Sequence, residues 1–96
     1  MNLQEELLQL TESYYSNRYR EWLGNNQSVI NNIKDVMYKE AKKGLFSAAT
    51  TLCLSDNDLF NLKKWFSYTG LKYRIAYAGD GTDYDLYVTW DISEND

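Results

Sequence analysis

The sequence contains no histidine and no proline, and it has a single cysteine, Cys53. Without histidine, the chain lacks the side chain that proteins use most often as a general base and as a metal ligand. It also has no glycine-rich loop of the kind that cradles phosphate groups. Asp80, Asp83 and Asp85 are not spaced as in an EF-hand. Weak calcium binding at these residues is the alternative to the absence of a metal site. We therefore expect no enzymatic activity, no cofactor and no metal site.

Long apolar segments are also missing. No apolar run approaches the ~20 residues that a membrane-spanning helix needs, and residues 1–20 are polar and acidic, unlike a signal peptide. We expect a soluble, cytoplasmic protein. The lone cysteine excludes an internal disulfide. Its position between Leu52 and Leu54 favours a small buried apolar side chain, with a reactive thiol as the alternative.

Basic residues are absent from the last seventeen positions, 80–96. Six acids and no base give this segment a charge of −6, whereas the whole chain carries −4, so residues 1–79 carry +2. Three aromatic residues lie between the acids, at Tyr84, Tyr87 and Trp90. The placement of charge governs which partners a small protein attracts. This segment therefore predicts binding to a partner, not catalysis.

Two helices are predicted in the first half of the chain. In residues 2–23 apolar side chains recur at spacings of three and four, and Gly24-Asn25-Asn26 is expected to end the helix. The same periodicity predicts a second helix from about Ser28 to Lys43. Gly44 can then supply the left-handed residue that commonly follows a helix.

A strand and a third helix are predicted next. Both faces of the segment from Leu45 to Leu54 are fairly apolar, so we expect a strand in the centre of a sheet. Ser55 with Asp58 three residues later resembles a capping box that opens a helix. Gly70 is expected to end that helix.

The last part of the chain reads as a β-hairpin. Apolar and polar residues alternate in 71–78 and again in 84–92, and the turn falls at 79–82. The element order is α-α-β-α-β-β. We therefore expect a single α+β domain, residues 1–96, whose small sheet includes a C-terminal antiparallel hairpin packed on helices.

One hairpin register places the apolar rows of both strands on one face. In it Leu71 faces Trp90 and Ile75 faces Leu86. The opposite face would carry Lys72, Arg74, Asp85, Tyr87, Thr89 and Asp91. Each cation would lie diagonal to an acid, within reach of a long side chain.

This outer face allows two interpretations. It is either a solvated face, on which each exposed ion pair contributes ~0–1 kcal/mol, or a docking surface for a basic protein. Four acids have no cation to pair with in the hairpin, and they favour the second interpretation. They are Asp80, Asp83, Glu94 and Asp96.

The three tryptophans, Trp22, Trp65 and Trp90, lie on apolar stripes, so core packing is expected for them. Basic residues gather on the second and third predicted helices and could contact phosphates. An acidic chain with a pI near 4.7 argues against that function. These basic residues are Lys34, Lys39, Lys42, Lys43, Lys63 and Lys64.

Three segments together resemble a pattern found in small uncharacterised bacteriophage and virus proteins. They are residues 40–47 (EAKKGLFS), residues 62–73 with Gly70, and residues 84–90 (YDLYVTW). This sequence departs from the commoner form of the pattern at Leu71, because a Tyr usually follows the glycine there. The resemblance implies a phage or viral origin. Small acidic phage proteins often block host factors, and some imitate DNA, including inhibitors of histone-like nucleoid proteins and of CRISPR nucleases.

Together these observations predict an acidic, non-enzymatic inhibitor in the host cytoplasm. It would bind a basic nucleic-acid-binding host protein by DNA mimicry, without binding nucleic acid or membrane itself. The partner-binding residues are expected to be Asp80, Asp83, Asp85, Tyr87, Asp91 and Glu94, with Glu5, Glu12 and Glu21 as a second acidic strip. The alternatives are an assembly protein that forms a homodimer through its N-terminal helix, and a nucleic-acid-binding module that uses the helical lysines.

Overall fold

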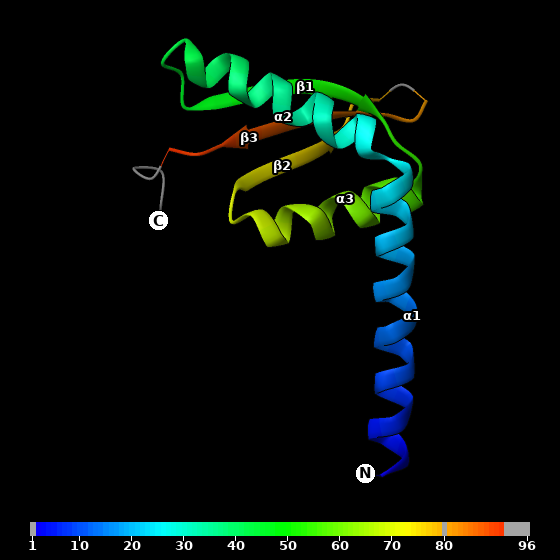
Figure 1. Cartoon of the computed structure of the whole chain (residues 1–96). Helices are drawn as coiled ribbons and strands as arrows, with labels where there is room; N and C mark the ends of the chain where they lie inside the picture. The colour runs from blue at the N-terminus through cyan, green and yellow to red at the C-terminus, as the bar shows by residue number, and fades with distance from the viewer. Residues whose placement is uncertain (1, 80, 92–96) are drawn as a thin grey trace.

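The computed structural model describes residues 2–79 and 81–91. Three helices and three strands follow one another in the predicted order, α-α-β-α-β-β, so the fold is α+β (Figure 1). The elements are α1 (Leu3–Asn25), α2 (Gln27–Lys42), β1 (Ser47–Cys53), α3 (Asp56–Thr69), β2 (Lys72–Tyr77) and β3 (Asp83–Thr89).

The sheet is antiparallel and has the strand order β1-β3-β2. The central strand is therefore β3, and the prediction that β1 would be central is wrong. The second face of β1 carries small residues such as Ala49 and Thr51, and it stays exposed. Small side chains made both faces of this segment look apolar, yet they tolerate water on one side.

The hairpin register is the predicted one. Ile75 pairs with Leu86 and Arg74 pairs with Tyr87. Side chains alternate between the faces of a strand, so this register sends every second residue of β2 and β3 to the same side. The apolar alternation in the sequence was sufficient to specify the pairing.

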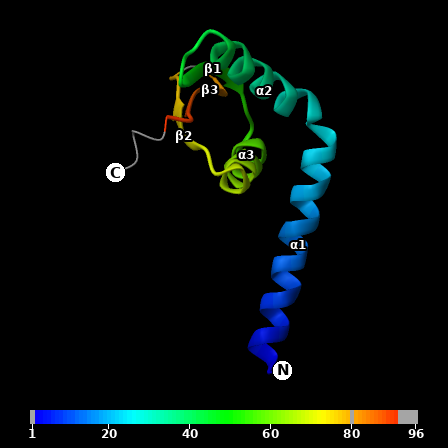
Figure 2. The ribbon, with the colours of Figure 1, turned by 60° about the vertical axis from the view of Figure 1, so that its left-hand side comes forward.

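Both α2 and α3 cover the same face of the sheet, and no described helix packs on the other face, called the bare face below (Figure 2). The helices and the covered face enclose a core that also includes one residue of α1. The Phe66 ring stacks on Tyr73 of β2, with ring centres 4.6 Å apart. The buried core consists of Trp22, Ile30, Ile33, Leu54, Leu62, Phe66, Leu86 and Val88.

The ends of α3 are closed as the sequence predicts. The Ser55 hydroxyl accepts a hydrogen bond from the Asp58 backbone at 3.1 Å, and the Asp58 carboxylate accepts one from the Ser55 backbone at 3.0 Å. This reciprocal pair satisfies two backbone donors that a helix start leaves unpaired. Gly70 follows with a φ of 75°, in the left-handed region.

Helix α1 projects from the rest of the molecule (Figures 1 and 2). Trp22, close to its C-terminal end, is its only buried residue among those described. Its N-terminal half leaves large apolar side chains in solvent. These are Leu3, Leu7, Leu8, Leu10, Tyr14 and Tyr15. The molecule is accordingly long in one direction, with principal extents of 53 × 33 × 24 Å.

Cys53 is exposed, which corrects the prediction of a buried side chain. It lies on the bare face of the sheet, because the neighbouring Leu52 and Leu54 point to the covered face. Its Sγ lies 2.8 Å from the Thr82 hydroxyl oxygen. An apolar neighbour on each side therefore did not indicate burial, since in a strand adjacent residues face opposite ways.

Candidate functional site

The bare face of the sheet presents a row of polar side chains on its central strand. Asp83, Asp85 and Tyr87 alternate along β3 and therefore point to the same side. Small residues flank this row, Ala49 on β1 and Ala76 on β2. Asp85, Tyr87 and these two alanines, with neighbouring side chains, line an open depression of about 560 Å³. The short side chain of Ala76 leaves the neighbouring Asp85 accessible to the side chains of a partner.

The two carboxylates of this row keep their charge unbalanced. Asp85 accepts a hydrogen bond from the neutral Thr51 hydroxyl at 3.0 Å. The guanidinium of Arg74, which the register places diagonal to Asp85, instead lies over the Tyr87 ring, 5.7 Å from its centre. Within residues 2–79 and 81–91, neither Asp83 nor Asp85 forms a salt bridge. The half of the bare face nearest the 79–82 turn is therefore negative.

Of the other predicted hairpin residues, only Asp91 is among the described residues. Asp80 and Glu94 fall outside the described residues. Asp91 follows the end of β3, and its backbone N–H donates to the Thr89 hydroxyl at 3.2 Å. Among the described residues, the row itself therefore contains three of the predicted partner-binding residues.

The second predicted strip, on α1, is not continuous with this row. Glu5 is in the first turn of α1, near the free end. Glu12 borders a cleft between α1 and α3 that also contains Lys63. Glu21 lines a separate polar cleft at the α1–α3 junction. Nine residues are two and a half helical turns, so Glu12 and Glu21 point in opposite directions.

The α1–α3 junction contains a polar contact that sequence reasoning missed. The Trp22 indole Nε1 donates to the Asp58 carboxylate at 2.8 Å. Partial burial alone would raise the pKa of Asp58, but hydrogen bonds from the Ser55 backbone, the Trp22 indole and the Ser55 hydroxyl outweigh it and lower this pKa. The capping role of Asp58 was readable from local spacing. Nothing in the sequence signals an indole donor that is 36 residues away.

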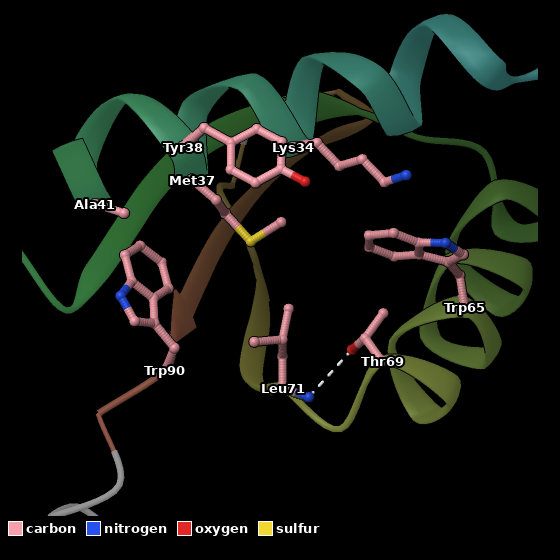
Figure 3. Close-up of a pocket in the computed structure, with 8 residues that line it drawn as sticks. All are labelled: Lys34, Met37, Tyr38, Ala41, Trp65, Thr69, Leu71 and Trp90. Atoms are coloured by element: carbon pink, nitrogen blue, oxygen red, sulfur yellow. Dashed lines mark hydrogen bonds between the residues drawn. The ribbon is translucent and has the colours of Figure 1, made fainter.

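A second concave surface lies between α2 and α3 (Figure 3). Trp65 and Trp90 stand on opposite sides of this groove, Met37 and Leu71 lie between them, and Lys34 is at the rim. Its volume is about 340 Å³. Trp65 and Trp90 are half-buried here, so the expectation of core packing holds fully only for Trp22.

The groove exists because α2 and α3 both cover the sheet but do not contact each other along their full length (Figure 3). Such a gap depends on how segments distant in sequence pack, which periodicity does not report. Aromatic and aliphatic side chains dominate its lining. These side chains suit apolar contact, and Lys34, Tyr38 and Thr69 add polar groups to the lining.

The helical lysines are divided between surfaces. Lys34 borders the groove, while Lys63 and Lys64 line the cleft against α1. The ammonium of Lys64 lies 5.3 Å from the centre of the Tyr19 ring. Lys43 lies 3.4 Å from the Glu40 carboxylate. This distribution gives no observation in favour of a single phosphate-contacting face.

Among residues 2–79 and 81–91, no three Cys, Asp or Glu side chains lie close enough together to hold a metal ion. None of the helices described here is both long and apolar enough to cross a bilayer.

Comparison of this chain with protein-family models, with curated proteins and with solved structures gave no match.

Proposed function

We propose that this chain is a non-enzymatic protein that binds a basic partner through the bare face of its sheet. The observation that carries this proposal is a pair of carboxylates without a salt bridge, the half-buried Asp83 and the exposed Asp85, two residues apart on the bare face of the central strand β3. Exposed carboxylates attract a basic surface over about a Debye length, ~8 Å at physiological salt. The antiparallel sheet holds their backbones in a fixed geometry, so the anions are presented without an ordering cost in the main chain.

The partner that fits this chemistry is a nucleic-acid-binding protein, whose Arg and Lys side chains normally contact phosphates. Residues two apart in a strand are ~7 Å apart, so the strand presents its two carboxylates, Asp83 and Asp85, at about that spacing. Carboxylates accept the same charge-assisted hydrogen bonds from guanidinium groups as phosphates do. Tyr87 continues the row and adds a rigid aromatic contact of the kind enriched in protein interfaces. The resemblance to phage proteins adds a host protein as the kind of target.

The mechanism would be competition. The chain would occupy the phosphate-binding side chains of its partner and thereby exclude DNA. Each carboxylate buried against Arg or Lys would contribute ~1.5–3 kcal/mol as a charge-assisted hydrogen bond. No group on the bare face would need to react.

The experiment replaces both carboxylates without changing their shape, in the variant Asp83→Asn/Asp85→Asn. Bacterial lysate is passed over the immobilised wild type and over the variant, and captured proteins are quantified by mass spectrometry. A captured basic protein is then purified and bound to a fluorescent DNA duplex. We expect the wild type to displace the duplex. The variant should need at least a ~10-fold higher concentration to do so, which corresponds to a loss of about 1.4 kcal/mol in binding free energy.

A matched control separates this surface from net charge. Asp35→Asn/Asp56→Asn removes two exposed charges from the helices and should displace the duplex as the wild type does. Circular dichroism verifies that all three proteins are folded. Equal displacement by the wild type and by Asp83→Asn/Asp85→Asn would contradict the proposal, as would equal losses in both double variants.

A further inference from the structure

The free half of α1 carries a regular apolar seam, formed by Leu3, Leu7, Leu10 and Tyr14. Their spacing of four, three and four residues is the heptad spacing of a coiled coil. Leu3 is 68% exposed and Leu10 is 69% exposed, and the other two are 54% exposed each. An exposed apolar patch of this regularity marks a protein contact.

Within residues 2–79 and 81–91 this seam stays uncovered, because α3 packs on another side of α1. The Tyr15 ring lies 6.0 Å from Phe60, and the Tyr19 ring lies 5.7 Å from Tyr68. These contacts form a stripe about a third of a turn away from the seam. The Tyr14 hydroxyl accepts a hydrogen bond from Arg18 at 2.9 Å, which orients the last residue of the seam.

We propose that the seam is covered by the same seam of a second copy, with the two α1 helices antiparallel. The spacing four-three-four reads the same in both directions. An antiparallel pair therefore matches every seam position with another, Leu3 with Tyr14 of the second copy and Leu7 with Leu10 of the second copy. This self-complementarity is the argument for a second copy over an unrelated partner.

The residues that continue the seam favour the antiparallel orientation. The next two heptad positions are Asn17 and Glu21. A parallel pair would bring Glu21 of one chain close to Glu21 of the second copy, and the two carboxylates would repel each other. It would also place the two helix dipoles parallel, which is unfavourable. An antiparallel pair ends at Tyr14, so Asn17 and Glu21 have no counterpart, and the two sheets lie at opposite ends of the pair.

The size of the seam predicts a weak dimer. Four side chains from each copy, with their flanks, would bury on the order of 1,000 Å² in total, the low end for specific interfaces. We therefore expect a dissociation constant in the micromolar range.

Sedimentation across a range of protein concentrations tests whether the pair forms. We expect the wild type to shift from monomer to dimer as concentration rises. Leu7→Asp should remain monomeric, because it places a charge in the seam. Gln9→Asp, on the polar side of the same helix, is the matched control and should dimerise as the wild type does. Since Leu7 is exposed in the monomer, its replacement should leave the circular dichroism spectrum unchanged.

Disulfide trapping tests the orientation. Two variants, Leu3→Cys and Tyr14→Cys, are made in a Cys53→Ser background and oxidised separately and as a mixture. We expect covalent dimers in the mixture, because positions 3 and 14 meet only across an antiparallel pair. Each variant alone should give few, since identical positions would be ~16 Å apart along the helix.

Three outcomes would overturn the inference. They are a monomer at all concentrations, a dimer that Leu7→Asp does not weaken, and efficient trapping of Leu3→Cys by itself, which would mean a parallel pair. None of these outcomes bears on the proposed function, because the bare face of the sheet is not part of the seam.

Discussion

Asp58 combines two structural roles in one carboxylate. It closes the start of α3 through Ser55 and joins α3 to α1 through the Trp22 indole. The hydrogen bonds that it accepts lower its pKa in the folded protein, despite the opposing effect of partial burial. A carboxyl group with a depressed folded pKa stabilises the fold above its unfolded pKa, ~3.9, and this contribution is lost as pH falls through the folded value.

The variant Asp58→Asn should therefore change how stability depends on pH. At about pH 7 we expect a lower free energy of unfolding than in the wild type, because a neutral amide accepts weaker hydrogen bonds. Below about pH 4 the two curves should converge, since the wild type loses its carboxylate contribution there. Urea unfolding at a series of pH values measures this. Asp35→Asn, an exposed control, should run parallel to the wild type, and a pH-independent gap for Asp58→Asn would contradict the argument.

At the scale of the elements, two glycines have opposite structural roles. Gly24 lies within α1, where an added Cβ would meet nothing within 4 Å. Gly70 ends α3 with a left-handed φ of 75°. Open space therefore surrounds both positions, and only the backbone conformation distinguishes them.

Alanine at the two positions should shift stability in opposite directions. Gly24→Ala is expected to raise the free energy of unfolding by about 0.5–1 kcal/mol, because alanine favours the helix. Gly70→Ala is expected to lower it by about 1 kcal/mol, because a Cβ disfavours the left-handed region. Thermal or urea unfolding decides the sign of each change. Changes of the same sign would show that backbone conformation is not the deciding factor.

The elements were largely predictable from the sequence because their signals are local. The capping box at Ser55, the glycine stop at Gly70 and the alternation in the hairpin each involve residues close in the chain. The position of β1 in the sheet and the groove beside Trp65 and Trp90 depend on contacts between distant segments. For the same reason the shared face of Asp85 and Tyr87 was predictable. Asp83 was expected beside the turn and instead begins β3, and the separation of this row from the acids of α1 was not predictable.

At the scale of the whole molecule, the projecting α1 dominates the shape. The radius of gyration over Cα atoms is 16.1 Å, whereas a compact chain of this length would have ~12–13 Å. The excess comes from a helix half whose large side chains are mostly solvent-exposed. Removing that half should therefore cost little stability.

Deletion of residues 2–10 should leave the urea midpoint nearly unchanged, within about 0.5 kcal/mol in the free energy of unfolding, as expected for exposed positions. Small-angle X-ray scattering should give a radius of gyration several ångströms smaller than for the full chain. The full-length protein for this comparison carries Leu7→Asp. This variant is expected to be monomeric, so both radii of gyration are those of monomers. A compact radius in that reference would mean that α1 folds back onto the sheet in solution. A large fall in stability would mean that the helix half packs on the rest of the molecule.

Cys53 lies directly across from Asp83 in the pairing of β1 with β3, and it is exposed. The chain therefore carries a native attachment point for a thiol-reactive dye beside its acidic row. Because no other cysteine competes for the label, one reaction would give a uniformly tagged protein. A change in the emission of that dye would then report the approach of any molecule to this part of the sheet.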